Sequence, residues 1–177
     1  MLQYLSDRMY DEVRGPGLTY GVSMALSVTE GRLTLSLTRS SRLSEAYETV
    51  KEILTRYIEN DDEWNETFAE SAKGSMIYSW AEKEETVEDL VGETVKAYMR
   101  VTDAKYNRNF VRDLGRVNVE DIKSAAKQFL PEFLSSDTSQ TVIVCNPASV
   151  EEIVKDFSSF GIELTSYDRL EDTFLVN

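Results

Sequence analysis

An arginine and a tyrosine lie six positions apart in a stretch that also holds three of the chain's eight glycines. Arg14 carries a rigid fork of N–H donors and Tyr20 carries a phenolic hydroxyl, so the two side chains could together bind a carbonyl oxygen or a carboxylate. Gly15, Gly17 and Gly21 indicate a backbone conformation that residues with a side chain resist. We therefore predict that Arg14 and Tyr20 bind a substrate, on a corner built by the three glycines.

A plainer interpretation of the same stretch is also open. In it, the glycines only form a tight turn, Arg14 pairs with an acidic neighbour, and Tyr20 is half-buried. Strict strand alternation places Tyr20 on the same face as Val22 and Met24. A bulge at Gly21, or a strand that begins after it, would free the tyrosine to turn away. The sequence alone does not decide between these orientations.

The residues on either side of the corner predict a helix that leads into a hairpin. Apolar residues recur at the spacing of an amphipathic helix, at Leu2, Leu5, Met9 and Val13. No capping residue precedes this helix, so we expect the natural domain to begin upstream. From Thr19 onward the apolar period is two, and two alternating runs flank a turn at Glu30-Gly31, as in a β-hairpin.

Most of the remaining chain carries the apolar pattern of helices. Further helices are predicted at about 43–60, 61–83, 86–99, 107–115, 118–130 and 149–160. The expected N-caps are Ser41 or Ser44, Thr86, Asn118 and Ser149, and Pro131 should end or kink the helix before it. Aromatic residues at helical spacing should lie in the core. A β-branched run predicts a buried strand at Thr141–Cys145, and a last short strand is predicted at Ile162–Leu164.

Composition limits the classes of partner. The 177 residues, of which 41% are hydrophobic, suffice for one domain with a core. With 19 basic against 32 acidic residues the net charge is −13, which would repel nucleic-acid phosphates and anionic lipid. No apolar run approaches the roughly 18 residues of a spanning helix, and no signal peptide is visible. We therefore expect neither nucleic acid nor a membrane as a partner.

The chain contains no histidine and one cysteine, Cys145. Zinc hydrolysis usually needs imidazole ligands and a Ser-His or Cys-His pair needs a histidine, so only carboxylate, lysine or tyrosine chemistry is left for an independent active site. A single cysteine allows no internal disulfide, which fits a reducing compartment, and in its apolar run it should pack as a small hydrophobe. We predict no catalytic residue and no metal ligand in this chain.

The stretch Leu5–Gly21 resembles the C-terminal half of the pitrilysin family of zinc peptidases, and most of all the single-chain members close to presequence protease. In that family an arginine and a tyrosine follow a helix of the last domain, around a glycine-rich turn. They reach the active site of the other half and hold the substrate backbone near the scissile bond. Arg14 and Tyr20 are the matching positions. The family binds zinc through an H-x-x-E-H motif, so the resemblance implies zinc in the full-length parent and no cofactor in this chain.

The resemblance covers roughly residues 1–165 and leaves 166–177 as a C-terminal tail. It implies an α+β fold, part of a mitochondrial-processing-peptidase-like metallohydrolase domain in which several helices pack on an antiparallel-containing sheet. We expect a fragment or an incomplete gene model of a larger peptidase, in the cytoplasm or, alternatively, the mitochondrial matrix. Its expected function is that of a non-catalytic C-terminal domain of a zinc metalloendopeptidase, inactive alone. Its partners would be the peptide substrate and the N-terminal half of the same peptidase. The alternatives are a structural domain of an inactive family member and an acidic protein-interaction module.

Overall fold

The computed structural model describes residues 1–100, 102–103 and 105–173. In this part of the chain, seven α-helices accompany one two-stranded antiparallel sheet, which confirms an α+β fold. The α-helices are α1 (Leu2–Met9), α2 (Leu43–Glu59), α3 (Glu66–Glu82), α4 (Val87–Met99), α5 (Tyr106–Leu114), α6 (Val119–Leu134) and α7 (Val150–Ser159). The strands are β1 (Thr19–Ser27) and β2 (Arg32–Ser40). Four short helical segments complete the list: a π-helix η1 (Tyr10–Arg14) and the 3₁₀ turns η2 (Asp61–Glu63), η3 (Pro147–Ser149) and η4 (Leu170–Asp172).

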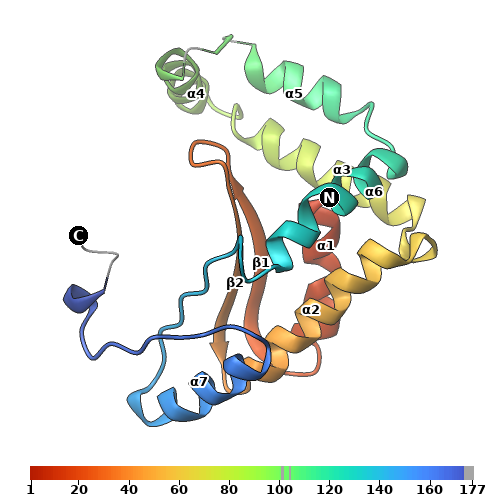
Figure 1. The fold of residues 1–177 in the computed structure, drawn as a ribbon. Helices are drawn as coiled ribbons and strands as arrows, with labels where there is room; N and C mark the ends of the chain where they lie inside the picture. Colours follow the sequence, from red (N-terminus) through yellow and green to blue (C-terminus); the bar gives the residue numbers. More distant parts are fainter. Residues whose placement is uncertain (101, 104, 174–177) are drawn as a thin grey trace.

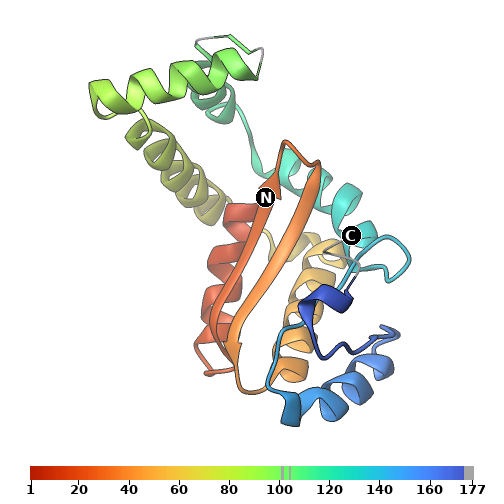
Figure 2. The ribbon, with the colours of Figure 1, turned by 90° about the vertical axis from the view of Figure 1, so that its left-hand side faces the viewer.

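The helices α1, α2 and α6 pack together beside the β1–β2 hairpin, and α7 lies against α2 (Figure 1). The helix α3 leads away from this group, and α4 and α5 lie at its far end, so the three form an arm that projects beyond the hairpin (Figures 1 and 2). Figure 2 looks onto the face of the hairpin opposite to the helices. Alternate residues of β2 are exposed there, because a strand directs successive side chains to opposite faces.

The core forms where the predicted apolar stripes meet. Leu5, Met9 and Val13 are fully buried, and they recur every four residues, as predicted for the first helix. The helix α2 contributes Ile53 and Leu54, and further buried side chains come from α6 and from the turn before α3, among them Ile122, Ala126, Leu130 and Trp64. Burial of this apolar surface is the main favourable term that holds α1 and η1, and therefore the corner, in place.

The predicted helix ends were right where a capping box was present. Thr86 and Asn118 each accept a hydrogen bond from the backbone N–H three residues on, at Asp89 and Asp121. The N-cap of α2 is Arg42, so the predictions for Ser41 and Ser44 were wrong, whereas Ser149 is the N-cap residue of α7 but forms no side-chain cap hydrogen bond. Ser44 donates a hydrogen bond to Asp156 instead, at 2.6 Å, and so links α2 to α7. Pro131 does not end α6, which continues to Leu134.

Both strands predicted in the last third of the chain were wrong, because Thr141–Cys145 and Ile162–Leu164 lie outside any strand. Val144 is 95% exposed and Cys145 is also exposed, not packed as a small hydrophobe. β-propensity mainly measures how well a side chain fits against neighbouring strands, so a β-branched run that finds no partner strand forms no ladder. The η4 turn lies in the predicted tail 166–177, and residues 174–177 of that tail lie outside the described residues.

The apolar stripe of α4 was also misplaced. We expected aromatic residues at helical spacing in the core, but Tyr98 of α4 is exposed and no residue of α4 is buried. Six of its apolar side chains are exposed, namely Val87, Leu90, Val91, Val95, Tyr98 and Met99. An amphipathic pattern therefore predicted the helix correctly but not what would cover its apolar face.

Candidate functional site at the helix–strand corner

The corner between η1 and β1 has a backbone in which all three predicted glycines have a physical reason. Gly17 adopts φ of +78°, which residues with a Cβ rarely adopt. A Cβ on Gly15 would lie 2.3 Å from the carbonyl oxygen of Asp11, because the π-helix brings the chain back on itself. At Gly21 a Cβ would lie 2.6 Å from Oγ1 of Thr38 on the neighbouring strand. Each of these three positions therefore favours glycine.

This corner brings the two predicted side chains together. The guanidinium carbon of Arg14 lies 5.2 Å from the centroid of the Tyr20 ring. Tyr20 is 61% exposed, so it belongs neither to the core nor to a half-buried packing layer. Arg14 forms no ion pair with any described residue, so the plainer interpretation, in which it pairs with an acidic neighbour, does not hold.

The strand does not free Tyr20 by either of the two routes that we considered. The register from Thr19↔Ser40 to Ser27↔Arg32 is constant, so no bulge occurs at Gly21, and β1 begins at Thr19. Thr19 and Met24 are nevertheless both buried, although alternation would place them on opposite faces. The departure of β1 from strict alternation therefore lies between Thr19 and Met24. It is next to the one described position at which β2 departs from β backbone geometry.

That position is Arg39, which has φ of +54°. Its guanidinium carbon lies 5.3 Å from the centroid of the Tyr20 ring. Arg39, like Arg14, forms no ion pair with any described residue. One exposed tyrosine ring therefore has two guanidinium groups beside it, and no carboxylate is paired with either.

A second tyrosine completes the cluster. Arg14 donates a hydrogen bond from Nη1 to the hydroxyl of Tyr10 at 2.5 Å, and its guanidinium carbon lies 4.7 Å from the centroid of that ring. We name Tyr10, Arg14, Tyr20 and Arg39 the corner cluster. Sequence reasoning missed Tyr10 and Arg39, although two signals were present. Tyr10 lies four residues before Arg14 on one helix face, and the hairpin turn sets the register that brings Arg39 opposite Tyr20.

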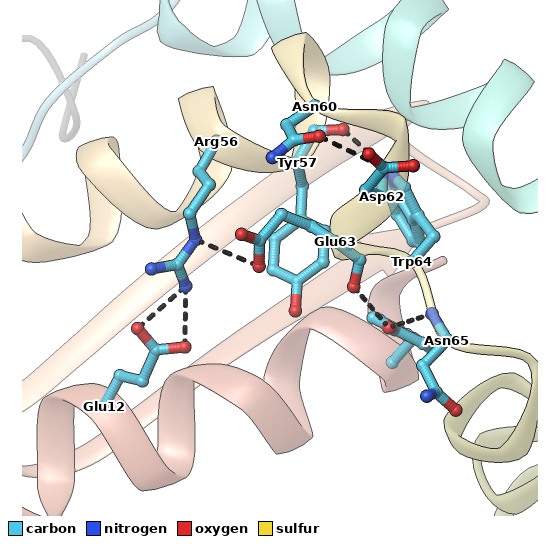
Figure 3. Close-up of polar contacts among 9 residues, drawn as sticks. Glu12, Arg56, Tyr57, Asn60, Asp62, Glu63, Trp64 and Asn65 are labelled. Carbon is cyan, nitrogen blue, oxygen red and sulfur yellow. Dashed lines mark hydrogen bonds and ion pairs between the residues drawn. The ribbon is translucent and has the colours of Figure 1, made fainter.

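A polar network fixes the helix that carries Arg14 (Figure 3). Arg56 of α2 donates to both carboxylate oxygens of Glu12, at 2.7 and 2.8 Å, and its Nε lies 3.5 Å from Glu63 (Figure 3). The hydrogen bond to Glu12 raises the pKa of Arg56 above its ordinary value. Glu12 is two residues from Arg14, so its capture by Arg56 both anchors η1 and leaves Arg14 without this carboxylate as a partner.

The same network continues into the core. The Tyr4 hydroxyl donates to the carbonyl of Glu63 at 3.4 Å and accepts from the backbone N–H of Asn65 at 3.0 Å. Trp64 donates from Nε1 to the carbonyl of Tyr57 at 3.0 Å (Figure 3). The rings of Tyr4, Tyr57 and Trp64 pack against one another with centroids 4.9 to 5.7 Å apart. This network joins α1, α2 and η2 and so positions the base of the corner.

A large concave space of about 2730 Å³ lies along the hairpin. Its lining comes mainly from β2, the segment 138–146, α7 and the facing ends of α3 to α6. Of the corner cluster, only Arg39 takes part in the lining. We take the corner cluster as the candidate site, because it places two guanidinium groups that have no carboxylate partner among the described residues beside one exposed tyrosine ring.

The zinc that the resemblance implies would belong to the full-length parent, and the described residues of this chain offer no place for it. No three histidine, cysteine, aspartate or glutamate side chains among them converge as a metal site would require. Together with a sequence that has no histidine, the residues of this chain do not fit a structural or catalytic zinc ion. In the same part of the chain, no helix combines the length and apolar character needed to span a bilayer.

Comparison with known proteins gives relatives but no family. No family model matches the chain, and no solved structure matches it. The uncharacterized protein YOL098C of Saccharomyces cerevisiae is 24% identical over 172 residues, which are 97% of this chain and 16% of the yeast protein. The uncharacterized protein C05D11.1 of Caenorhabditis elegans is 25% identical over 158 residues, 88% of this chain and 16% of the worm protein. The uncharacterized protein C3H1.02c of Schizosaccharomyces pombe is 21% identical over 159 residues, 88% of this chain and 15% of that protein. The chain therefore spans about a sixth of the length of these relatives.

Proposed function

We propose that this chain is a non-catalytic C-terminal domain of a zinc metalloendopeptidase of the pitrilysin type. In this proposal it positions a peptide substrate against a zinc site that the N-terminal half of a longer protein carries. The observation that carries the proposal is the pair of half-buried Arg14 and exposed Tyr20, with the guanidinium carbon 5.2 Å from the ring centroid and no carboxylate partner among the described residues. The length of the relatives, about six times that of the matched segment, is compatible with it.

Binding of a peptide at the corner requires no proton transfer by Arg14 or Tyr20. The Arg14 guanidinium presents N–H donors and the Tyr20 hydroxyl can donate once, so both can bind carbonyl oxygens of an extended peptide. If the bound oxygen gains negative charge during a reaction, preorganised donors stabilise that charge because they need not reorient. This role needs the two side chains held in place, which the network around Glu12 and Arg56 provides.

Peptide binding by the purified chain tests this role directly. An extended peptide is titrated into the wild-type chain and into Arg14→Ala and Tyr20→Phe, with binding followed by calorimetry. Loss of charge-assisted hydrogen bonds should weaken binding about tenfold or more in Arg14→Ala, and loss of the hydroxyl should weaken it about two- to tenfold in Tyr20→Phe. Arg32→Ala serves as the control, because Arg32 is an exposed arginine at the far end of the hairpin that pairs with Glu30. Equal affinity in all four proteins would reject the proposal.

Metal content and turnover extend the test to the longer protein. The isolated chain should hold no stoichiometric zinc and cleave no peptide. In a protein that contains both halves, loss of one donor to the developing charge should lower kcat/KM by about 10² to 10³. A longer protein without turnover would favour the structural domain of an inactive family member, whereas unchanged turnover in both Arg14→Ala and Tyr20→Phe would show that the corner takes no part in catalysis.

A second candidate function is an acidic protein-interaction module, and α4 favours it. Its six exposed apolar side chains form the kind of helix face that partners cover. The two candidates differ in their predictions. An interaction module would bind its partner through α4 and would not bind a peptide at the corner. The peptidase domain would bind its peptide through Arg14 and Tyr20.

A further inference from the structure

We propose that the corner cluster selects peptides that present a carboxylate, bound between Arg14 and Arg39 beside the Tyr20 ring. The carboxylate could belong to an acidic side chain or to the C-terminus of the peptide. This inference rests on the proposed function, because it names the chemical group that the peptide-binding corner prefers. Its new element is Arg39, which makes the site a two-arginine site.

The first observation is electrostatic. Arg14 and Arg39 each lie within 5.3 Å of the centroid of one ring. Two like charges gathered in this way repel each other, and a bound anion would relieve the repulsion. The chain has 32 acidic residues, and arginines such as Arg56 and Arg42 are bound by glutamates. The corner guanidiniums have no such partner among the described residues, so they are available to a carboxylate from outside.

The second observation is the backbone of Arg39. It is the one non-glycine residue of the described chain with positive φ, at +54°. Such a conformation costs free energy and persists only where the surroundings impose it. Here the neighbours on both sides are held: Thr19 donates to the carbonyl of Thr38 at 2.8 Å, and Ser40 donates to the carbonyl of Leu18 at 2.6 Å. The strand thus holds an arginine in a conformation that glycine would adopt more easily.

The third observation is the fit between donor and ligand. A guanidinium group presents paired N–H donors whose geometry matches both oxygens of a carboxylate, and such bonds are stronger than those to a neutral carbonyl. The nearby carboxylate of Glu12 does not compete, because Arg56 binds both of its oxygens. Arg39 also lines the concave space along the hairpin. A peptide bound in that space could therefore extend to the corner and place its carboxylate there.

Three peptides of one extended sequence separate the sources of the carboxylate. The first carries an internal glutamate and an amidated C-terminus, the second carries glutamine with the same amide, and the third carries glutamine with a free C-terminus. We expect the first or the third to bind the wild-type chain about tenfold more tightly than the second. The preferred one identifies the source, and the preference should shrink as salt increases.

The variant Arg39→Gly makes the test specific. It should abolish the preference for the carboxylate, which is measured as the ratio of the affinities of this variant for the acidic and the neutral peptide. Because glycine accepts positive φ, Tm should hold or rise, so loss of preference could not be ascribed to unfolding. Arg39→Lys, which keeps the charge but not the fork, should retain part of the preference. Arg116→Gly is the control and should keep all of it, because Arg116 is an exposed arginine that pairs with Asp113 and does not line the concave space.

The outcomes distinguish the two proposals. Equal affinity for all three peptides, each weakened by Arg14→Ala, would reject carboxylate selection and leave the peptide-binding corner standing. A preference that survives Arg39→Gly would reject the role of Arg39. Absence of binding by any peptide would reject both the inference and the function on which it rests.

Discussion

At the scale of single residues, the buried hydroxyl of Tyr57 is the group through which the stability of the core network should depend on pH. Its ring is 2% exposed and packs against Tyr4 and Trp64. Burial raises its pKa well above the ordinary value of 10.0, because the charged phenolate would lose hydration. Tyr47 of α2 has a raised pKa for the same reason. The neutral form of each hydroxyl is therefore favoured in the folded state.

We predict that this burial makes the fold sensitive to alkali. Below pH 10 both folded and unfolded Tyr57 are neutral, so its contribution to the free energy of unfolding is fully present. Above pH 10 the unfolded form loses its proton first, and stability falls by up to about 1.4 kcal/mol per pH unit for one such group. Urea unfolding at a series of pH values from 8 to 11 measures the decline. Tyr57→Phe keeps the ring and should decline less steeply, so identical slopes would contradict the prediction.

At the scale of elements, two glycines show how backbone conformation decides whether a glycine-to-alanine substitution stabilises or destabilises the fold. A Cβ added at Gly17 or at Gly74 would meet nothing within 4 Å. Gly17 has φ of +78° at the corner, whereas Gly74 lies inside α3. Space is equal at the two sites, so only the backbone distinguishes them.

We therefore predict opposite effects for the same change. Gly17→Ala should lower the free energy of unfolding by about 1 to 2 kcal/mol, because alanine is strained at positive φ. Gly74→Ala should raise it by about 0.5 to 1 kcal/mol, because alanine favours the helix and restricts the unfolded chain. Chemical denaturation of the two variants beside the wild type gives both values. Two shifts of the same sign would show that the corner is not set by Gly17.

At the scale of the whole molecule, the projecting arm presents an apolar surface. The exposed side chains of α4 include Val91 at 57% and Val95 at 51%. The net charge of −13 opposes self-association through repulsion, and salt screens that repulsion. Apolar contact between arms should therefore become visible as ionic strength rises.

The prediction is that added salt increases the average mass in sedimentation equilibrium and that two lysines on the apolar face prevent this. Val91→Lys with Val95→Lys should keep the chain monomeric and change the free energy of unfolding by no more than about 0.5 kcal/mol, since neither valine is buried. Thr94→Lys is the control, because Thr94 is exposed on the same helix. If Thr94→Lys has the same effect, charge alone and not the apolar face governs association.

The sequence by itself determined the features that depend on near neighbours. Helical spacing located Leu5, Met9 and Val13 in the core, and the capping boxes at Thr86 and Asn118 began their helices as predicted. Alternation around the Glu30-Gly31 turn gave the hairpin, and the cluster of glycines marked the corner. These features follow from interactions within a few residues, which the local sequence carries in full.

Only the tertiary structure decided the features that depend on distant partners. Tyr20 is exposed although alternation places it on the face of the buried Met24, and no pattern near Tyr20 encodes the positive φ of Arg39 across the hairpin. The run Thr141–Cys145 has the composition of a strand but no strand beside it, and α4 has an apolar face but no element over it. β-propensity and amphipathicity indicate that a segment can pair with a strand or bury an apolar face. Whether it does so depends on contacts with segments far apart in the chain, which the local sequence does not specify.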